Sequence, residues 1–433
     1  MPKNYYKTET GKALNNFNFS YHKVNWNFIE SIVKIKIATA LANSKTNNLD
    51  QNIAKAIVWA CGEVLKGKLE DQFLLPALQG GAGTSINMNV NEVLASLASE
   101  YLNNKIKVHY LDHVNLNQST NDVCPSALRI TTYFLLKDLQ KTLDLLIRQF
   151  EIKSKEFSKI KKLSRTHLQD SVPTTLGKEF LSYVNIIASH KKNLEKAEAL
   201  MLELNLGGTI IGDIDSTSAS FRINSYKELK KITGVNFHPA KNLMAKTSSL
   251  GDFLIVSQTL VVLGSDLSKI ASDIRLMSSG PNGGFGELVL ADLQKGSSFM
   301  PGKVNPVMCE LVNQWYFLVS GNNLMIEKAS ENGQLELNTM FPLAADKLLE
   351  SLSLSKEILQ IFSDKCIKTM KANSEKCLSN LENSTALAIY FVPLLGYDKV
   401  EKIVKESYSS KKSFKELILE QGISEKQWKK IIK

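Results

Sequence analysis

The sequence has no uninterrupted apolar segment of the roughly 18 residues that a membrane-spanning helix requires. Residues 1–10 are polar and charged, and no apolar signal-peptide core follows them, so we expect a cytoplasmic protein without a membrane partner. Glycine (23 residues) and proline (10 residues) are scarce in a chain of 433. This scarcity argues against both a fibrous and a disordered protein.

Cysteine is also scarce, because the five cysteines are scattered and form no CxxC pair. An odd number at such spacing argues against a disulfide framework and against a zinc site. The sequence contains no phosphate-binding loop followed by Lys-Ser/Thr, no dinucleotide fingerprint and no set of ligands at metal spacing. We therefore expect a protein that uses neither a metal nor a cofactor.

Acidic residues number 43 against 53 basic ones, which gives a net charge of +10. The lysines are spread along the chain in short groups such as residues 159–162, and no nucleic-acid-binding module accompanies them. We expect a solvated surface and no nucleic-acid partner, or else a field that attracts small dianions. The hydrophobic content of 43% suffices for a large core, and the length exceeds one ordinary domain.

Long helical patterns occupy the middle of the chain, between widely spaced prolines. Apolar residues recur at three- and four-residue steps in 133–150 and 176–206, and 307–332 is typical of another long helix. Residues 250–278 are at first apolar on nearly all sides, so this helix must be buried, and other subunits are one candidate for its cover. Four such helices in a row predict an extended bundle.

Strand signals are few and short, so the sequence predicts a mainly α protein. We expect a mostly helical N-terminal domain at 1–125, a central helix-bundle domain at 126–345 and a small helical C-terminal domain at 346–433.

Four polar segments interrupt the helical pattern, at residues 80–89, 118–122, 165–170 and 296–306. Taken alone, the first is compatible with a loop that leads into an N-capped helix, and the second with a helix cap. The third contains His167, which is either a surface histidine or a group that moves protons near neutral pH. The fourth has two glycines, two prolines, two serines, a lysine and an asparagine, which is too specialised for an ordinary turn.

The chemistry of these segments must come from hydroxyls, amides, one lysine and one histidine. That set of groups suits an anionic substrate, proton abstraction and the stabilisation of an oxyanion, without redox work.

Residues 296–305 read Gly-Ser-Ser-Phe-Met-Pro-Gly-Lys-Val-Asn, which resembles the Gly-Ser-Ser-x-Met-Pro-x-Lys-x-Asn loop of the aspartase/fumarase superfamily. The other three polar segments resemble the remaining shared regions, in the same order, and the resemblance runs from about Tyr5 to the C-terminus. Residues 119–121, 305–314 and 333–338 are more similar to the aspartate ammonia-lyase branch than to the fumarases.

The resemblance implies a three-domain fold whose central long-helix bundle is completed by homotetramerisation, with active sites shared between subunits. It implies a carbon–nitrogen lyase for a small dicarboxylate, which deaminates L-aspartate to fumarate and ammonia by anti-elimination through an enediolate. A fumarase, or a lyase for a related succinyl substrate, is the alternative, and a catalytically silent helical scaffold is the third hypothesis.

The resemblance also implies roles for individual residues. Ser297 is the expected base, and Glu310 is the expected partner of His167. The carboxylate that gains charge would be held by Thr84, Ser119, Thr120 and Ser298. The other carboxylate would be held by Thr166, Lys303 and Asn305, and the leaving amine would face Asn121 and His167.

Two segments depart from the family pattern. Asn282 follows Gly280 and Pro281 where the family usually has arginine, and residues 212–216 replace a Gly-Thr-Gly-x-Asn segment. These departures keep the alternative substrates open.

Overall fold

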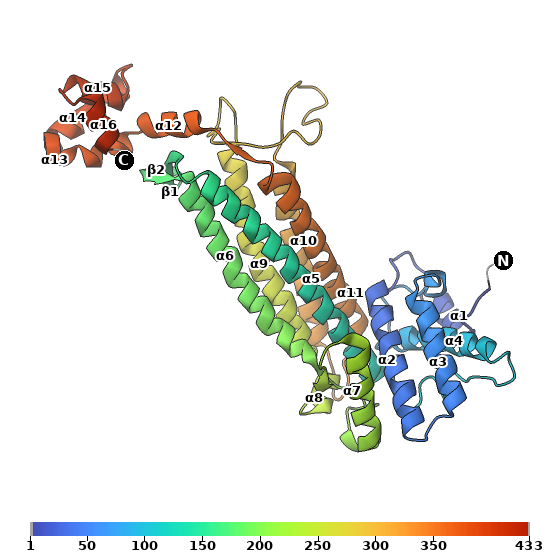
Figure 1. The fold of residues 1–433 in the computed structure, drawn as a ribbon. Helices are drawn as coiled ribbons and strands as arrows, with labels where there is room; N and C mark the ends of the chain where they lie inside the picture. Colours follow the sequence, from blue (N-terminus) through green and yellow to red (C-terminus); the bar gives the residue numbers. More distant parts are fainter. Residues whose placement is uncertain (1–2, 432–433) are drawn as a thin grey trace. The chain divides into compact units, whose positions relative to one another are not determined.

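The fold was taken from a computed structural model that describes residues 3–431. The chain is mainly helical, with three small two-stranded sheets (Figure 1), so the prediction of a mainly α protein is confirmed. Its contacts divide it into two compact units. Unit 1 comprises the chain up to Gln140, Lys192–Val262 and Phe317–Lys356, and unit 2 comprises Lys141–Lys191, Leu263–Tyr316 and the chain from Glu357 onward.

Unit 1 contains a packed group of helices in which α2 contacts α3, α4 and α7. Three of these four helices begin at side-chain caps. Asn25 accepts from the backbone N–H of Asn27 at the start of α2, Asp50 accepts from those of Asn52 and Ile53 at the start of α3, and Ser218 accepts from that of Phe221 at the start of α7. The helices are α1 (Thr8–Asn16), α2 (Trp26–Lys45), α3 (Gln51–Leu65), the short η1 (Glu70–Gln72), α4 (Thr84–Tyr101), η3 (Ile214–Ser216), α7 (Ala219–Thr233) and α8 (Leu243–Ser248).

Five long helices each contribute residues to both units. They are α5 (Thr120–Glu156), α6 (Leu176–Ala199), α9 (Gly251–Met277), α10 (Val307–Glu331) and α11 (Phe341–Phe362). The long helices predicted in the middle of the chain are therefore present. However, α5 begins at Thr120 rather than near residue 133, and α6 ends at Ala199 rather than at 206 because the 3₁₀ turn η2 (Leu200–Leu202) follows it.

Helix α9 is apolar but only partly covered. By length and composition it could cross a membrane, yet 50% of its most apolar window is buried within the structure. Within unit 1, Phe253, Val256 and Leu260 are fully buried, whereas Ile255 and Val262 are 46% and 53% exposed. One face of α9 thus lies in the core of the chain and another carries exposed aliphatic side chains.

The sheets are short, and each has two strands. In unit 2, β1 (Lys161–Thr166) and β2 (Gln169–Thr175) form an antiparallel hairpin, and β5 (Leu288–Val289) pairs antiparallel with β6 (Lys371–Ala372). In unit 1, β3 (Glu203–Leu204) pairs in parallel with β4 (His238–Pro239).

The C-terminal helices of unit 2 surround a small apolar core. Phe391 stacks on Trp428 with ring centroids 5.1 Å apart, and Leu163 of the β1–β2 hairpin belongs to the same buried cluster. The elements are the π-helical turn η4 (Ser363–Ile367), α12 (Ser374–Glu382), η5 (Thr385–Tyr390), α13 (Val392–Leu395), α14 (Tyr397–Ser409), α15 (Phe414–Glu420) and α16 (Glu425–Ile431). The division into three domains remains a prediction.

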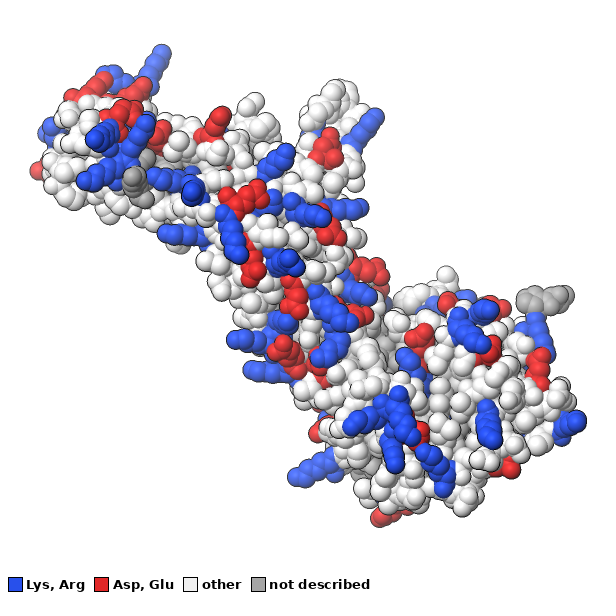
Figure 2. Space-filling model, viewed as in Figure 1, with Lys and Arg blue, Asp and Glu red and all other residues white. Residues whose placement is uncertain are grey.

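Charged side chains are spread over the visible face of the molecule. Figure 2 shows lysine and arginine interspersed with aspartate and glutamate rather than gathered in one patch. This distribution fits the interpretation of the positive net charge as a solvated surface.

Candidate active site

The segment Ser119–Asn121 lies at the start of α5 and is held by a buried carboxylate. Asp122 is fully buried and accepts hydrogen bonds from the backbone N–H groups of Ser119 at 2.9 Å, Gly207 at 2.9 Å and Thr209 at 3.1 Å. Burial raises the pKa of Asp122 to about 6, although the three N–H donors act in the opposite direction. This carboxylate fixes the backbone from which the polar side chains project.

Pro125 lies inside α5 and leaves the carbonyl of Asn121 without its usual helical donor. Asn205 replaces the missing donor, because its Nδ2 lies 2.9 Å from the Asn121 carbonyl oxygen. The Asn121 side chain in turn donates to the carbonyl of Ile210 at 2.8 Å. Segment 205–210 therefore supports the first turn of α5.

Thr84 is the first residue of α4 and lies near the same turn of α5. The preceding Gly83 has φ +89°, and the Cys124 thiol is 3.8 Å from its carbonyl oxygen. Asn87, one turn along α4, donates to the Thr120 hydroxyl at 3.3 Å. The structure thus brings the predicted residues Thr84, Ser119, Thr120 and Asn121 together in unit 1.

Lys36 was missed by the sequence analysis. It is fully buried in α2, and its Nζ donates to Asn115 Oδ1 at 2.9 Å and to Gln118 Oε1 at 3.0 Å. Burial lowers the pKa of Lys36 to about 7. Because Gln118 directly precedes Ser119, this lysine supports the loop that leads into α5. A lysine between Ile35 and Ile37 was the signal available in the sequence.

The departure at residues 212–216 forms a compact turn in unit 1. Gly212 has φ +81°, and a Cβ at this position would meet the Met244 backbone at 2.5 Å. The Asp213 side chain accepts from the N–H of Asp215 at 3.0 Å and so caps η3. The other departing residue, Asn282, is exposed in unit 2.

His167 lies at the tip of the β1–β2 hairpin, between Thr166 and Gln169, which pair across the two strands. His167 and Leu168 have φ values of 56° and 59°, in the left-handed region. Two-residue hairpin turns whose central residues both lie in the left-handed region usually contain Asn-Gly. A residue such as His or Leu in this region raises the conformational free energy by about 1 kcal/mol or more. The tip is therefore strained backbone that presents an exposed histidine.

The loop between Gly296 and Asn305 is closed at its base. Asn305 Nδ2 donates to the Gly296 carbonyl at 2.6 Å. A Cβ on Gly296 would lie 1.9 Å from the carbonyl oxygen of Lys303, so only glycine fits. Inside this loop, the Ser297 hydroxyl oxygen accepts from the backbone N–H groups of Phe299 at 3.0 Å and Met300 at 2.8 Å.

The remaining predicted residues of unit 2 are open to solvent or partly covered. Ser298 and Lys303 are exposed, and Lys303 has no ion-pair partner among residues 3–431. Glu310 lies in the first turn of α10, where the helix dipole favours a carboxylate. In the described part of the chain no hydrogen bond joins His167 to Glu310 or to Ser297. The predicted site residues are therefore divided between the two units of one chain.

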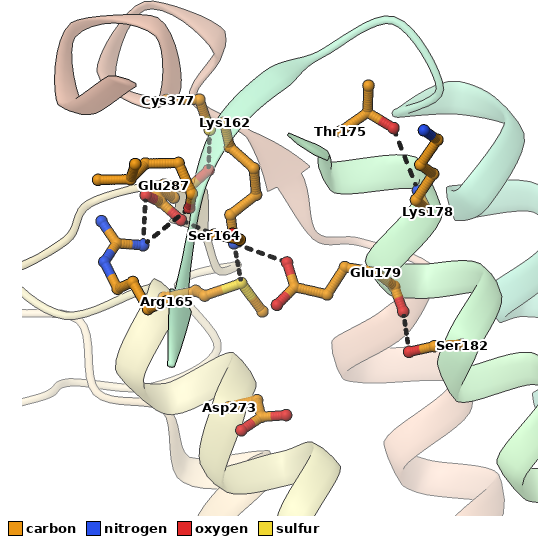
Figure 3. A network of polar contacts seen from close by, with 12 residues as sticks. Lys162, Ser164, Arg165, Thr175, Lys178, Glu179, Ser182, Asp273, Glu287 and Cys377 are labelled. Carbon is orange, nitrogen blue, oxygen red and sulfur yellow. Dashed lines mark hydrogen bonds and ion pairs between the residues drawn. The ribbon is translucent and has the colours of Figure 1, made fainter. Parts of the chain in front are cut away.

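The sequence analysis also missed a buried carboxylate, that of Glu287, which contacts strand β1 of the hairpin. Glu287 is fully buried, with Arg165 NH1 2.8 Å from its Oε1 and Lys162 Nζ 3.0 Å from its Oε2. Figure 3 shows both cations pointing toward Glu287, with Glu179 of α6 also contacting Lys162. A single acidic residue in the Gly-Glu-Leu segment after Pro281 gave no signal that could distinguish it from a surface glutamate.

Comparisons with known proteins identify the family of the chain. A family model described as lyase matches residues 3–321. The aspartate ammonia-lyase of Helicobacter pylori is 40% identical over 98% of this chain and 92% of its own length. The Escherichia coli enzyme is 40% identical over 97% of this chain and 89% of its own length.

Solved structures match the fold over the whole chain. A fumarate lyase:delta crystallin from Brucella melitensis, bound to cobalt, is 38% identical with a TM-score of 0.95, over 100% of this chain and 95% of its own. A class II fumarase from Schistosoma mansoni is 32% identical with a TM-score of 0.93, over 100% and 95%. With its Ser297 loop, its hairpin histidine and these relatives, the chain belongs to the lyase family that contains the aspartate ammonia-lyases and fumarases.

Proposed function

We propose that the protein deaminates L-aspartate to fumarate and ammonia. The observation that carries this proposal is the geometry of Ser297, whose hydroxyl oxygen accepts hydrogen bonds from two backbone N–H groups. A free serine hydroxyl is too weak an acid to serve as a base. Donors directed at its oxygen stabilise the anionic form, and exclusion of water by the loop strengthens this effect.

The reaction begins when the Ser297 oxyanion takes the proton from the Cβ of aspartate. The electron pair of that C–H bond moves onto the adjacent carboxylate and gives an enediolate with an additional negative charge. Preorganised donors for this charge come from hydroxyl groups and supply the main stabilisation. The residues proposed for this task are Thr84, Ser119, Thr120 and Ser298.

The enediolate then collapses to fumarate. Its electron pair forms the Cα–Cβ double bond while the Cα–N bond breaks and the leaving pair stays on nitrogen. Asn121 and His167 face the departing amine in this proposal, and Glu310 orients His167. The carboxylate that does not change charge is held by Thr166, Lys303 and Asn305, and the exposed Lys303 supplies its positive counter-charge.

We propose that the complete site forms between subunits of a cytoplasmic homotetramer. Two observations support this. The predicted site residues fall into two units of one chain, and neither unit holds the whole set. In addition, an open groove in unit 1 exposes Ile255 and Val262 of α9 beside Ala197 of α6 and Leu200 of η2. Its other lining residues are polar, namely Asn193, Lys196, Gln258 and Thr259. Exposed aliphatic side chains on long helices are typical of a face that another subunit covers.

The decisive experiment measures fumarate by ultraviolet absorbance, and ammonia in parallel, after L-aspartate is added to purified protein. Equal amounts of fumarate and ammonia are expected without any added nucleotide or flavin. D-aspartate and the Ser297→Ala variant are the controls. D-aspartate should give no product, and the variant should give almost none. Fumarate from L-malate without any from L-aspartate would instead establish the fumarase alternative. No product from either substrate would support the silent scaffold.

A further inference from the structure

Glu287 connects three segments of unit 2 that are distant in sequence. Its carboxylate contacts Arg165 of β1 at 2.8 Å and Asn380 of α12 at 3.2 Å. Its backbone N–H donates to the Met277 carbonyl at 2.8 Å, at the end of α9, and its carbonyl accepts from the N–H of Asn373 at 2.9 Å. Glu287 therefore contacts the base of the hairpin, the end of α9 and the C-terminal helices.

The two cations on Glu287 are also largely shielded from solvent. The side chains of Lys162 and Arg165 are 3% and 13% exposed. The Arg165 guanidinium also lies 3.9 Å from the ring centroid of Phe285, two positions before Glu287. Removing such charges from water is unfavourable, and a buried ion network contributes little net stability compared with apolar residues of the same volume. The contacts of this network do, however, join three segments that are distant in sequence.

Both segments joined by the ion pair lead directly to proposed catalytic groups. Arg165 is followed by Thr166 and His167 at the strained hairpin tip. Glu287 is followed by β5, which ends at Val289, and then by the chain that carries Ser297. A small displacement of either group from its reactive position lowers the rate strongly.

We propose that Glu287 is a positioning residue, which through Arg165 and Lys162 holds the His167 hairpin in register with the stem of the Ser297 loop. The expected loss of kcat rests on the proposed function, whereas the fixed position of the hairpin and the loop stem does not. Without the carboxylate, Arg165 loses its ion-pair partner and Lys162 keeps Glu179, so the hairpin base is expected to shift.

The kinetic test compares Glu287→Gln with Glu287→Asp and with a matched control. The control is Asp252→Asn, which removes the carboxylate from the fully buried Arg129 of unit 1, 3.2 Å away, by the same change of acid to amide. We expect Glu287→Gln to lower kcat by roughly 10- to 100-fold with KM within about threefold, and Glu287→Asp to recover part of the loss. Asp252→Asn should lower Tm yet keep kcat within about threefold.

A double-mutant cycle with His167→Ala then separates positioning from general weakening. If Glu287 acts through the hairpin, Glu287→Gln should add less than about threefold to the loss already caused by His167→Ala. Full additivity, or equal kcat in Glu287→Gln and Asp252→Asn, would overturn the proposal.

Amide hydrogen exchange tests the structural claim independently of any substrate. Glu287→Gln should speed exchange in residues 161–175 and in 288–306, and Asp252→Asn should speed it in neither. Unchanged exchange in both segments would reject the positioning role. If the wild type releases no fumarate while exchange changes as expected, then the proposed function fails and the positioning role stands.

Discussion

The hydroxyl oxygen of Ser297 lies 2.8 Å from the backbone nitrogen of Met300, with the intervening turn wrapped around it. Ser297→Ala removes the only group placed to take the Cβ proton in the proposed reaction. We expect turnover to be nearly abolished while Tm and substrate binding change little, because the residue is on a loop outside the helical core. The measurements are kcat, KM and a thermal melt.

Ser298→Ala is the matched variant on the adjacent residue. Its hydroxyl would only donate to the developing charge, and loss of one such donor typically costs about 10²–10³ in rate. Turnover close to that of the wild type in Ser297→Ala would reject this serine as the base. His167 and Glu310 would then become the proton-transfer pair to test.

Gly296→Ala should disable the same loop without touching a catalytic group. The added Cβ would lie 1.9 Å from the Lys303 carbonyl oxygen, so the base of the loop must open. We expect kcat to fall by at least about 100-fold with little change in Tm, because the loop is outside the core. Gly62→Ala in α3 is the control, since nothing lies within 4 Å of its Cβ. That variant should be stabilised by roughly 0.5–1 kcal/mol and stay fully active. Wild-type kcat in Gly296→Ala would contradict the prediction.

Lys303→Ala should act mainly on binding. The lysine would neutralise the carboxylate that keeps the same charge in the ground state and the transition state, which is uniform binding. We therefore expect KM for aspartate to rise by at least about tenfold while kcat stays within about threefold. Steady-state kinetics over a wide range of aspartate concentrations measures both values. A large fall in kcat at unchanged KM would instead place Lys303 at the developing charge.

Lys36 should make stability depend on pH in the alkaline range. Its pKa falls from 10.5 in the unfolded chain to about 7 in the folded protein. Between these two pH values the folded protein binds fewer protons than the unfolded chain, so the free energy of unfolding rises with pH. The contribution of Lys36 to stability is therefore full above pH 10.5 and is lost as pH falls through about 7. Asp122 affects stability in another pH range, because burial raises its pKa from 3.8 to about 6. Its contribution to stability is full below pH 3.8 and is lost as pH rises through about 6.

Lys36→Met should therefore flatten the rise in unfolding free energy between about pH 7 and pH 10. Lys34→Met on the same helix is the control, because Lys34 is 27% exposed and can be hydrated in the folded state. Denaturant unfolding at several pH values measures the slope. An equal slope in Lys36→Met and the wild type would show that this lysine is not the titrating group.

Val262→Glu should disrupt assembly. Val262 is 53% exposed on α9, in the groove with Ala197 and Leu200, and a charge there opposes burial against another subunit. We expect light scattering to show a tetramer for the wild type and smaller, inactive species for the variant. Tyr397→Glu is the control, because Tyr397 is 69% exposed at the start of α14. A wild-type protein that is a 48.2 kDa monomer would contradict the shared site.

Much of the helical fold was predictable because burial follows the helical period. Of the apolar positions predicted along 133–150, Leu139, Leu143, Leu146 and Phe150 are fully buried, whereas Phe134 and Leu135 are only partly buried. The start of α5 was not predictable in this way. Pro125 normally ends a helix, and here a side chain distant in sequence, Asn205, supplies the lost hydrogen bond.

The site was predictable only in part, for a related reason. Its loop motif consists of consecutive residues, so Ser297, Lys303 and Asn305 are visible in the sequence. The His167 turn was not, because His-Leu has no preference for left-handed backbone and only the surrounding contacts impose it. Lys36 and Glu287 look like ordinary charged residues until the fold buries them, since their partners come from other segments.

All five cysteines are buried free thiols, and this gives the protein an internal reporter of local opening. A thiol reagent reaches them only when the surrounding structure opens, so the labelling rate measures how often each region opens. Cys309 lies beside Glu310 at the start of α10, and Cys377 lies in α12 beside the Glu287 carbonyl. Mass spectrometry of the labelled peptides would therefore time the opening of the catalytic loop stem and of the C-terminal helices separately, in one sample and without an added probe.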